Sequence, residues 1–466
     1  MTSLTSPSLV TETASFTITN PYDGEVIGQL PQASGADVFA AITRAKKAAA
    51  AFRFSMPSER RAILDKLAEL IAQEAESLAQ TVCKEVGKTI TEARNEIRRA
   101  GNTLRLSGDA ATFINGETMH CGIVKGGANK LATVTYEPVG VIAAITPFNY
   151  PVNLLCHKLG PAIAAGNAVI VKPSPKAPLS PNRVVELCQL AGAPEGLVQI
   201  VHGFADPAIA LARGPIDLLS FTGGAKAGLA LKNASGLVRC LMELGGNDPL
   251  FVMPDADLEA AADTAIGQRF EIAGQSCAAV KKLYVHKDIE ETFTNMLLER
   301  ISRIKLGNPI EDSTIMGPVI DEAAAKEVDK RVRAAVAAGA TLRTGGWIEK
   351  TRFAPTLLTG MSNDMQIYRE ETFGPLLAMR GFDDLDSAVE EVNDSIYGLQ
   401  AGIFTNDHAV IRKITRSLKV GGVMVNEGPD FRAEHVPFGG IKSSGLGREG
   451  IRITIREMSE SKVVID

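Results

Sequence analysis

The chain has 466 residues, of which 45% are hydrophobic and 22% are charged, and its formal net charge is −5. These values are typical of globular proteins in aqueous solution, and the length predicts two or three domains of about 100–200 residues each. Basic and acidic residues are interleaved along the chain. This distribution argues against the basic surface that nucleic-acid binding requires.

Targeting and redox features are few. The first 20 residues lack a basic region followed by an apolar one, so we expect no signal peptide. The most apolar stretch, residues 160–171, is interrupted by Pro161 and Asn167 and is too short to span a bilayer. The six cysteines form no C-x-x-C pair, which argues against a zinc site or a disulfide framework. We therefore expect a cytoplasmic protein that binds no metal, nucleic acid or membrane.

The first third of the chain is predicted to be helical. Residues 35–52 and 58–87 carry apolar side chains at helical spacing, with Ser58 as an expected N-cap. A third helical stretch covers residues 89–114. Residues 117–138 then change to β-rich alternation around two glycines, which predicts a hairpin.

From residue 139 the pattern becomes βαβ. Up to residue 244, five short apolar strands alternate with helices, which predicts a parallel sheet with both faces covered. In this architecture ligands bind at the carboxyl ends of the strands. A second αβ series begins near residue 245, and the last nine residues are typical of an edge strand.

Cys277 raises the question of function. A free cysteine is most often a small buried hydrophobe, so its neighbours elsewhere in the chain decide its role. Seven motifs stand out together: TPFNYP (146–151), VKPSPKAPLS (171–180), SFTGGAKAG (220–228), MELGGNDP (242–249), GQSC (274–277), EETFGP (370–375) and VPFGGIKSSGLGREG (436–450). Their order and spacing closely resemble the aldehyde dehydrogenase superfamily over essentially the whole chain.

The resemblance implies a fold and a domain organisation. The fold would be α/β and aldehyde dehydrogenase-like, with a Rossmann-type parallel-sheet cofactor domain, an α/β catalytic domain and a small β element for oligomerisation. The expected limits are 1–116 and 139–244 for the dinucleotide-binding domain, 245–443 for the catalytic domain, and 117–138 with 444–466 for the oligomerisation element.

The resemblance also assigns catalytic roles. Cys277 would attack the aldehyde, because a thiolate is the most nucleophilic side chain available. The amide of Asn149 and the backbone N–H of Cys277 would stabilise the oxyanion, and losing one such donor typically costs about 10²–10³ in rate. Glu243 would activate the water that hydrolyses the thioester. His157 is a candidate base for the thiol of Cys277, although the resemblance gives it no such role.

Cofactor binding carries over to further residues. No GxGxxG string follows a strand, but two glycines end one strand and begin a helix, where backbone N–H groups favour phosphate. Many family members have serine at the position of Gly224, so a hydroxyl contact to the pyrophosphate is expected to be missing. The implied NAD(P)-binding residues are Lys172, Ser174, Phe221, Thr222, Gly223, Gly224, Leu244, Glu371 and Phe373.

The choice between NAD and NADP depends on one departure from the family pattern. NAD-preferring members often carry a glutamate three residues after the strand-end lysine, and this chain has Pro175 there, followed by Lys176. Exchanging a negative charge for a positive one should admit NADP. We therefore expect NAD(P) without a fixed preference.

The substrate is expected to be a small aldehyde with a polar or anionic tail. Four residues are candidates for binding that tail, because an arginine with nearby donors suits a carboxylate, phosphate or phosphonate. They are Arg99, Tyr150, Arg432 and His435. Lactaldehyde, glyceraldehyde 3-phosphate and phosphonoacetaldehyde dehydrogenases are the nearest members in kind. Ser276 stands where some of them have a second arginine.

Two other functions compete with this interpretation. A CoA-acylating dehydrogenase would pass the acyl group to a thiol, but such enzymes often lack the glutamate found at position 243. A non-catalytic dinucleotide-binding scaffold would have lost the thiol, the glutamate or the asparagine, and this chain keeps all three. A homodimer or homotetramer is expected, because the hairpin and the last strand would otherwise leave sheet edges exposed.

Overall fold

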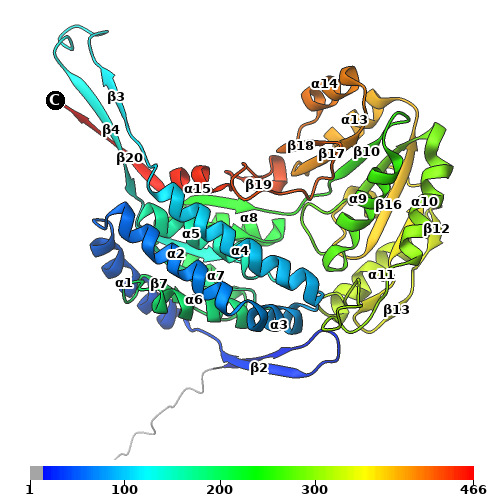
Figure 1. Cartoon of the computed structure of the whole chain (residues 1–466), viewed down its shortest axis with the longest axis horizontal. Helices are drawn as coiled ribbons and strands as arrows, with labels where there is room; N and C mark the ends of the chain where they lie inside the picture. The colour runs from blue at the N-terminus through cyan, green and yellow to red at the C-terminus, as the bar shows by residue number, and fades with distance from the viewer. Residues whose placement is uncertain (1–13) are drawn as a thin grey trace, which may run out of the picture.

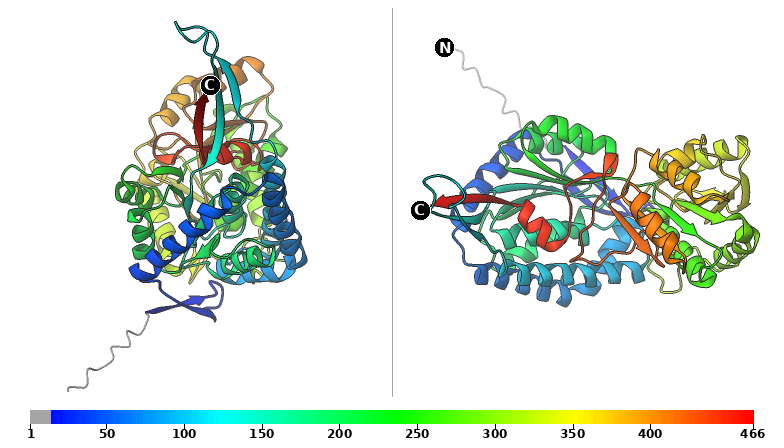
Figure 2. Two further views of the ribbon diagram at one scale, coloured as in Figure 1. Left: turned by 90° about the vertical axis from the view of Figure 1, so that its left-hand side faces the viewer. Right: turned by 90° about the horizontal axis from the view of Figure 1, so that it is seen from above.

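The chain forms two α/β domains side by side, with a three-stranded sheet projecting from the first (Figures 1 and 2). The computed structural model describes residues 14–466, so most of the segment considered for a signal peptide lies outside the described residues. Within residues 14–466, no helix is long and apolar enough to cross a membrane. The same residues contain no group of three or more His, Cys, Asp or Glu side chains placed to hold a metal ion.

The first domain contains a six-stranded sheet with the order β19-β9-β8-β5-β6-β7. Strands β5 to β9 are parallel, as predicted, whereas β19 is antiparallel to β9. The chain order reverses between β5 and β8, which marks the switch point where ligands bind in such sheets. The strands are β5 (Val141–Ile145), β6 (Ala168–Lys172), β7 (Val198–Ile200), β8 (Leu218–Thr222), β9 (Arg239–Glu243) and β19 (Gly445–Leu446).

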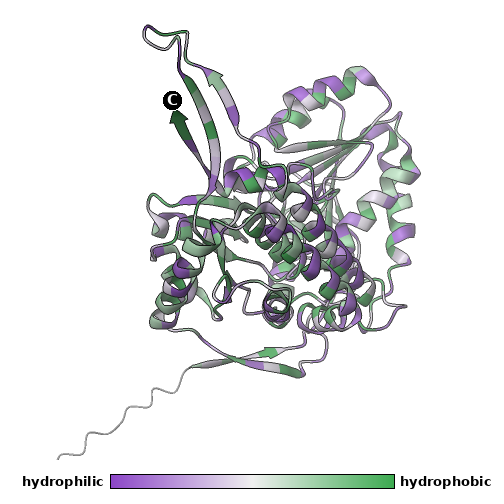
Figure 3. Cartoon of the chain, turned by 60° about the vertical axis from the view of Figure 1, so that its left-hand side comes forward, coloured by the Kyte–Doolittle hydropathy of each residue, from purple (hydrophilic) through white to green (hydrophobic). Residues whose placement is uncertain are grey.

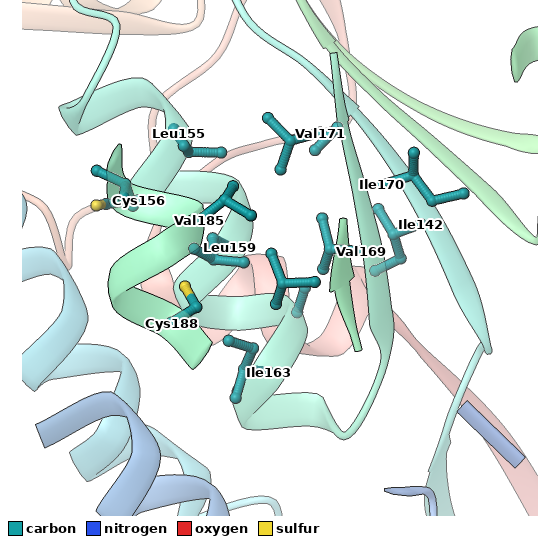
Figure 4. Close-up of a cluster of buried hydrophobic side chains, with 14 of the residues drawn as sticks. Ile142, Leu155, Cys156, Leu159, Ile163, Val169, Ile170, Val171, Val185 and Cys188 are labelled. Carbon is teal, nitrogen blue, oxygen red and sulfur yellow. The ribbon is translucent and has the colours of Figure 1, made fainter. Parts of the chain in front are cut away.

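Helices cover both faces of this sheet. Figure 4 shows one layer of the core, in which apolar side chains of α5 and α6 pack on β5 and β6 and include Cys156 and Cys188. Both thiols are fully buried, which agrees with their expected role as core residues. The helices are α1 (Gly35–Phe52), α2 (Pro57–Gln73), α3 (Ala75–Val86), α4 (Ile90–Ala111), α5 (Asn153–Ala165), α6 (Leu179–Leu190), α7 (Ala205–Arg213), α8 (Ala225–Ser235) and α15 (Ile451–Glu457).

Two predictions for the first third of the chain are wrong. The helix expected over 58–87 is divided at Glu74, and it begins earlier than Ser58, with Met56 as N-cap and Pro57 in the first turn. Proline suits that position because its missing N–H would be unpaired there anyway. An antiparallel hairpin of β1 (Ser15–Thr19) and β2 (Val26–Pro31) also precedes the helices.

The second domain contains a seven-stranded sheet with the order β12-β15-β16-β11-β10-β17-β18, parallel except for β12. Its strands are β10 (Pro249–Val252), β11 (Lys282–His286), β12 (Thr341–Thr344), β15 (Thr356–Thr359), β16 (Leu376–Phe382), β17 (Gln400–Phe404) and β18 (Gly422–Val425), beside the small hairpin β13 (Ile348–Glu349) and β14 (Arg352–Phe353). Its helices are α9 (Leu258–Phe270), α10 (Glu290–Ser302), α11 (Glu322–Ala337), α12 (Gln366–Arg369), α13 (Leu385–Asn393) and α14 (His408–Ser417), with short 3₁₀ turns η1 (Glu271–Gly274), η2 (Lys287–Ile289) and η3 (Lys442–Ser444).

The projecting sheet joins the predicted hairpin to the C-terminal strand. Strand β4 (Leu131–Pro138) pairs on one side with β3 (Glu117–His120) and on the other with β20 (Ser459–Ile465). Figure 3 shows hydrophobic residues along β20, where it stands clear of both domains. Within residues 444–466, β19 and α15 pack with the first domain, and β20 joins the projecting sheet.

Candidate active site

The candidate site lies where the carboxyl ends of the first domain's strands face the second domain. Asn149 follows β5, Lys172 ends β6 and Glu243 ends β9. Because the carboxyl ends of parallel strands meet at one edge of a sheet, these side chains come together. Cys277 faces them from the second domain, in the loop between η1 and β11.

A cleft of about 740 Å³ joins these residues, a volume in the usual range for small-molecule sites. Every residue expected to bind the cofactor lies on its wall, together with the three expected catalytic residues. They are Lys172, Ser174, Phe221, Thr222, Gly223, Gly224, Leu244, Glu371, Phe373, Asn149, Glu243 and Cys277. The four candidate substrate residues do not line this cleft.

The cleft fits a dinucleotide. Gly224 is the N-cap of α8, and a Cβ added there would meet nothing within 4 Å, so the helix N-terminus is open to a phosphate. The hydroxyls of Thr146 and Thr222 are buried without a hydrogen-bond partner, although both residues line the cleft. Phe148 and Phe373 pack edge to face beside them, with 6.0 Å between ring centroids. Together these groups offer apolar walls with a few unsatisfied polar contacts.

Two lysines lie at the β6 end of the cleft. Lys172 is buried, donates from Nζ to the carbonyl of Pro173, and has its pKa lowered to about 8 by desolvation. The side chain of Lys176 is half exposed and pairs with Asp321 at 3.0 Å. An exposed pair of this kind is weak, so an incoming phosphate can compete for the Lys176 ammonium.

The backbone that precedes Cys277, the expected nucleophile, is strained. Ile272 and Ala273 both have positive φ values, of 49° and 50°, which β-branched residues rarely adopt. Glu92, at the start of α4, accepts a 2.8 Å hydrogen bond from the N–H of Ile272. Strained backbone conformations require stabilising contacts from their surroundings. The carboxylate of Glu92 therefore helps to stabilise the turn at Ile272, which places Cys277 in the cleft.

The charges around the thiol of Cys277 shift its pKa in opposite directions. Desolvation raises the pKa of Cys277 to about 12; Lys281 opposes this shift, while Asp430 and Glu371 add to it. Lys281 donates to the carbonyls of Ser276 and Cys277, and its Nζ lies 3.4 Å from Oε1 of Glu371. One buried ammonium thus connects the backbone of Cys277 with the carboxylate of Glu371, one of the expected NAD(P)-binding residues.

A residue of α4 also helps to hold Asn149, the side chain expected to donate to the oxyanion. Nδ2 of Asn149 donates to the carbonyl of Gln275 at 2.9 Å, which leaves its other N–H free. The loop after Asn149 is held by Glu96, whose carboxylate accepts the N–H groups of Val152 and Asn153. Glu96 pairs in turn with Lys88 at 2.6 Å, and both side chains are fully buried.

Glu243 lies in a network of buried charges. Burial and the nearby Glu449 raise the pKa of Glu243 well above its usual value, while Arg432 and Lys158 oppose the shift. Glu449 itself pairs with Lys158 at 3.0 Å and with Arg432 at 2.7 Å. Oε2 of Glu243 is buried without a partner, so this carboxyl group is free to bind a water or a proton.

Three of the four candidate substrate residues lie in two separate sets of contacts. Arg99 donates from Nε to Glu434 at 2.8 Å, and Tyr150 lies close enough to interact with its charge. Arg432 stacks over the ring of Phe438 and is engaged by Glu449 and by Nδ1 of His157.

His435, the fourth candidate substrate residue, is exposed, whereas His157, the candidate base, is buried. Burial, with the nearby Arg432, lowers the pKa of His157 well below its usual value, so its ring is neutral. Its only hydrogen bond within residues 14–466 is the one to Arg432.

Several residues around the site were not predicted from the sequence. They act through contacts between segments far apart in the chain, which no local pattern encodes. These residues are Lys88, Glu92, Glu96, Lys158, Lys281, Asp430, Glu434 and Glu449. A charged residue inside an apolar helix, such as Lys158 in α5, is the one signal that could have been read in advance.

Comparison with known proteins identifies the family of this chain. A model of the aldehyde dehydrogenase family matches residues 9–464, and the chain belongs to that family. It is an NAD(P)-dependent aldehyde dehydrogenase that does not acylate CoA. The expected fold is confirmed by solved structures: an NADP-dependent glyceraldehyde-3-phosphate dehydrogenase from Bacillus halodurans C-125, complexed with NADP, has a TM-score of 0.95 at 35% identity over 97% of this chain and 95% of that one.

Its relatives act on small aldehydes, by their names. The sulfoacetaldehyde dehydrogenase of Neptuniibacter caesariensis is 38% identical over 451 residues, covering 97% of this chain and 99% of that protein. The 3-sulfolactaldehyde dehydrogenase of Priestia aryabhattai is 39% identical over 452 residues, covering 96% and 94%. An NAD-dependent aldehyde dehydrogenase structure from Sinorhizobium meliloti has a TM-score of 0.94 at 34% identity, covering 97% and 91%.

Proposed function

We propose that this enzyme oxidises a small aldehyde with a polar or anionic tail, using Cys277 as nucleophile, Asn149 as oxyanion donor and Glu243 as the base for hydrolysis. The observation that carries the proposal is that these three side chains line one cleft, although they come from three segments far apart in the chain. A thiol, an amide donor and a carboxylate with a raised pKa are the groups that acyl chemistry on sulfur requires.

The residues would act in sequence. The Cys277 thiolate adds to the carbonyl carbon, and the resulting oxyanion accepts the free N–H of the Asn149 amide and the N–H of Cys277. NAD(P)⁺, which Lys172, Glu371 and the N-terminus of α8 would hold in this cleft, would supply the acceptor for the hydride of the tetrahedral carbon. The thioester left on Cys277 is attacked by water, whose proton passes to Glu243, and the thiolate leaves as the acid forms.

Residues at the β6 end of the cleft would determine the choice between NAD and NADP. We propose that both NAD and NADP are accepted, because Pro175 offers no charge against a 2′-phosphate and Lys176 supplies a cation beside it. The exposed pair between Lys176 and Asp321 is the feature that a phosphate would have to displace. Structures of relatives carry either cofactor in their titles, NADP in one and NAD in another.

Arg99 is the proposed anchor for an anionic tail. Its Nε is held by Glu434, which fixes the plane of the guanidinium, and neither Nη atom has a hydrogen bond among the described residues. Those two donors suit a carboxylate, sulfonate or phosphate oxygen pair. Relatives named for sulfoacetaldehyde, 3-sulfolactaldehyde and lactaldehyde agree with a short polar tail.

The first test is turnover of neutral, hydroxylated and anionic aldehydes with NAD and with NADP. We expect oxidation with both cofactors and the highest kcat/KM for anionic aldehydes. Arg99→Ala should raise KM for anionic aldehydes by about 10-fold or more and change KM for neutral ones little, because one charged hydrogen bond contributes about 1.5–3 kcal/mol. Equal changes for both classes would show that Arg99 does not bind the tail.

We also propose that the enzyme is a cytoplasmic homodimer or homotetramer. Its six cysteines are free thiols, which suits a reducing compartment. The three-stranded sheet supports self-association, because Val463, Val464 and Ile465 are each more than half exposed on a strand that also forms a sheet edge.

A further inference from the structure

Asp430 is a carboxylate beside the nucleophile that the reaction does not use. It lies in the loop between β18 and η3, and its Oδ1 accepts a 3.0 Å hydrogen bond from the hydroxyl of Ser276, the residue before Cys277. Its N–H donates to Oε1 of Gln268 on α9 at 2.9 Å. Asp430 is therefore fixed in direction at both its backbone and its side chain.

The second oxygen of this carboxylate has no partner. Oδ2 of Asp430 is buried and makes no hydrogen bond to any residue in the described part of the chain. Burial, with the nearby Glu271, raises the pKa of Asp430 to about 6, which still leaves it ionised at neutral pH. A buried carboxylate oxygen without a donor costs free energy, so Oδ2 calls for a donor, which a bound substrate can supply in place of water.

Its neighbours place Asp430 on the substrate side of the nucleophile. Asp430 interacts with the charge of Arg99 and raises the pKa values of Cys277 and Tyr150, so it lies close to all three. It does not line the cleft that fits the dinucleotide. An aldehyde bound at Cys277 with its tail towards Arg99 would therefore pass Asp430 along its carbon chain.

We propose that Asp430 is a specificity-determining residue, whose Oδ2 accepts a hydrogen bond from a donor on the substrate's carbon chain next to the aldehyde. The donor is a hydroxyl or an ammonium group. This inference rests on the proposed function, and it narrows the substrate class to aldehydes that carry a donor near the carbonyl and an anionic or polar end. Because Ser276 and Gln268 fix the carboxylate, one enantiomer of a 2-substituted aldehyde should be preferred.

The unpaired oxygen of Asp430 determines how strongly the enzyme should prefer a substrate with a hydrogen-bond donor. A substrate without a donor leaves Oδ2 buried and unsatisfied, whereas one with a donor gains a charged hydrogen bond. Sites built to bind a substrate hydroxyl reject analogues without it far more strongly than apolar pockets reject an added methylene. We expect a preference of about 10-fold or more for lactaldehyde over propionaldehyde, which differ by one hydroxyl group.

The experiment compares kcat/KM for both lactaldehyde enantiomers, propionaldehyde and 3-aminopropionaldehyde in the wild type and in Asp430→Asn. Asparagine keeps the size and an acceptor for Ser276, but offers N–H where Oδ2 was. We expect the ratio of lactaldehyde to propionaldehyde to fall to within about twofold of one, and the enantiomer preference to fall with it. Glu427→Gln is the matched control, because Glu427 lies on the same loop and its carboxylate accepts from Gln268; its ratio should equal that of the wild type.

The results of this experiment distinguish failure of the inference about Asp430 from failure of the proposed function. The inference is overturned if, in the wild type, kcat/KM for propionaldehyde equals kcat/KM for both lactaldehyde enantiomers and for 3-aminopropionaldehyde. It is also overturned if Asp430→Asn keeps the wild-type ratios of kcat/KM. Either result leaves the dehydrogenase intact, because propionaldehyde is still oxidised. Failure of the wild type to oxidise any aldehyde would overturn the proposed function as well. A change of charge near Cys277 affects the two neutral substrates, lactaldehyde and propionaldehyde, alike, so the ratio of their kcat/KM values is independent of it.

Discussion

At the scale of single residues, Lys281 contacts both the proposed nucleophile, Cys277, and the proposed cofactor ligand Glu371. Its ammonium is buried against the carbonyls of Ser276 and Cys277 and close to Glu371. Removing it would leave two carbonyls without a donor and the carboxylate of Glu371 without its cation. Removing one partner of a buried ion pair typically destabilises a protein by more free energy than the pair itself contributes, because the other charge stays buried without a partner.

We expect Lys281→Met to lower kcat by about 10–100-fold and to raise KM for the dinucleotide, because both Cys277 and Glu371 lose their fixed positions. Alkylation of Cys277 at mildly alkaline pH should also become slower, since a cation that lowers the thiol pKa is lost. Steady-state kinetics and timed alkylation measure these effects. The matched control is Lys282→Met, which removes the neighbouring buried lysine that lies over the ring of Tyr368. If the two variants have the same kcat and alkylation rate, Lys281 has no special role.

At the scale of elements, the N-terminus of α8 is the expected phosphate site. Gly224 caps this helix with nothing within 4 Å of the position of a Cβ, whereas a Cβ on Gly223 would lie 2.5 Å from the ring of Phe221. The two adjacent glycines therefore differ sharply in the side chains that they tolerate.

Gly224→Ser should lower KM for the dinucleotide about two- to fivefold, because serine is a favoured N-cap and adds a hydroxyl beside the phosphate site. The melting temperature should stay within about 2 °C of the wild type, since glycine and serine caps differ by only a few tenths of a kcal/mol. Gly223→Ser is the control and should raise KM. A higher KM for Gly224→Ser would mean that phosphate does not bind at this turn.

Periodicity predicted most of the elements. The five alternating strands and helices from 139 to 244 occur where expected, because buried parallel strands read as short apolar runs. The break at Glu74 was not predicted, since apolar spacing continues across it. The hairpin β1–β2 was missed because its second strand is largely exposed and has no clean alternation.

The candidate site was predicted only where a motif covers it. Asn149, Glu243 and Cys277 were named from the sequence, because each lies in a family motif. Ser276 and Asp430 are 154 positions apart, so their contact became visible only in the folded chain. The same is true of Lys158 and Glu449.

At the scale of the whole molecule, the cleft between the domains and the projecting sheet suggest separate roles. The cleft takes residues from both domains, while β3, β4 and β20 stand apart from it (Figure 1). Exposed apolar side chains on a sheet edge are a liability for a monomer, and pairing with another copy covers them.

Val464→Asp should therefore weaken assembly, because a charge on β20 opposes burial in an interface between copies. We expect the wild type to behave as a dimer or tetramer by size-exclusion chromatography with light scattering, and the variant to shift towards the monomer. Glu460→Gln, on the same strand, should keep the wild-type mass. A monomeric wild type would contradict the proposed role of this sheet.

The central claim is that Cys277 holds the acyl group and that Glu243 releases it. Rapid mixing of Glu243→Gln with aldehyde and cofactor tests it most directly, by following reduced cofactor over time. We predict a burst close to one equivalent per active site, a slow steady state, and acyl mass on Cys277, because hydride transfer proceeds while hydrolysis lacks its base. In the wild type the hydrolytic rate should rise with pH, since the raised pKa of Glu243 delays its ionisation. Cys277→Ala should give no burst. A variant without a burst and with wild-type turnover would contradict the claim.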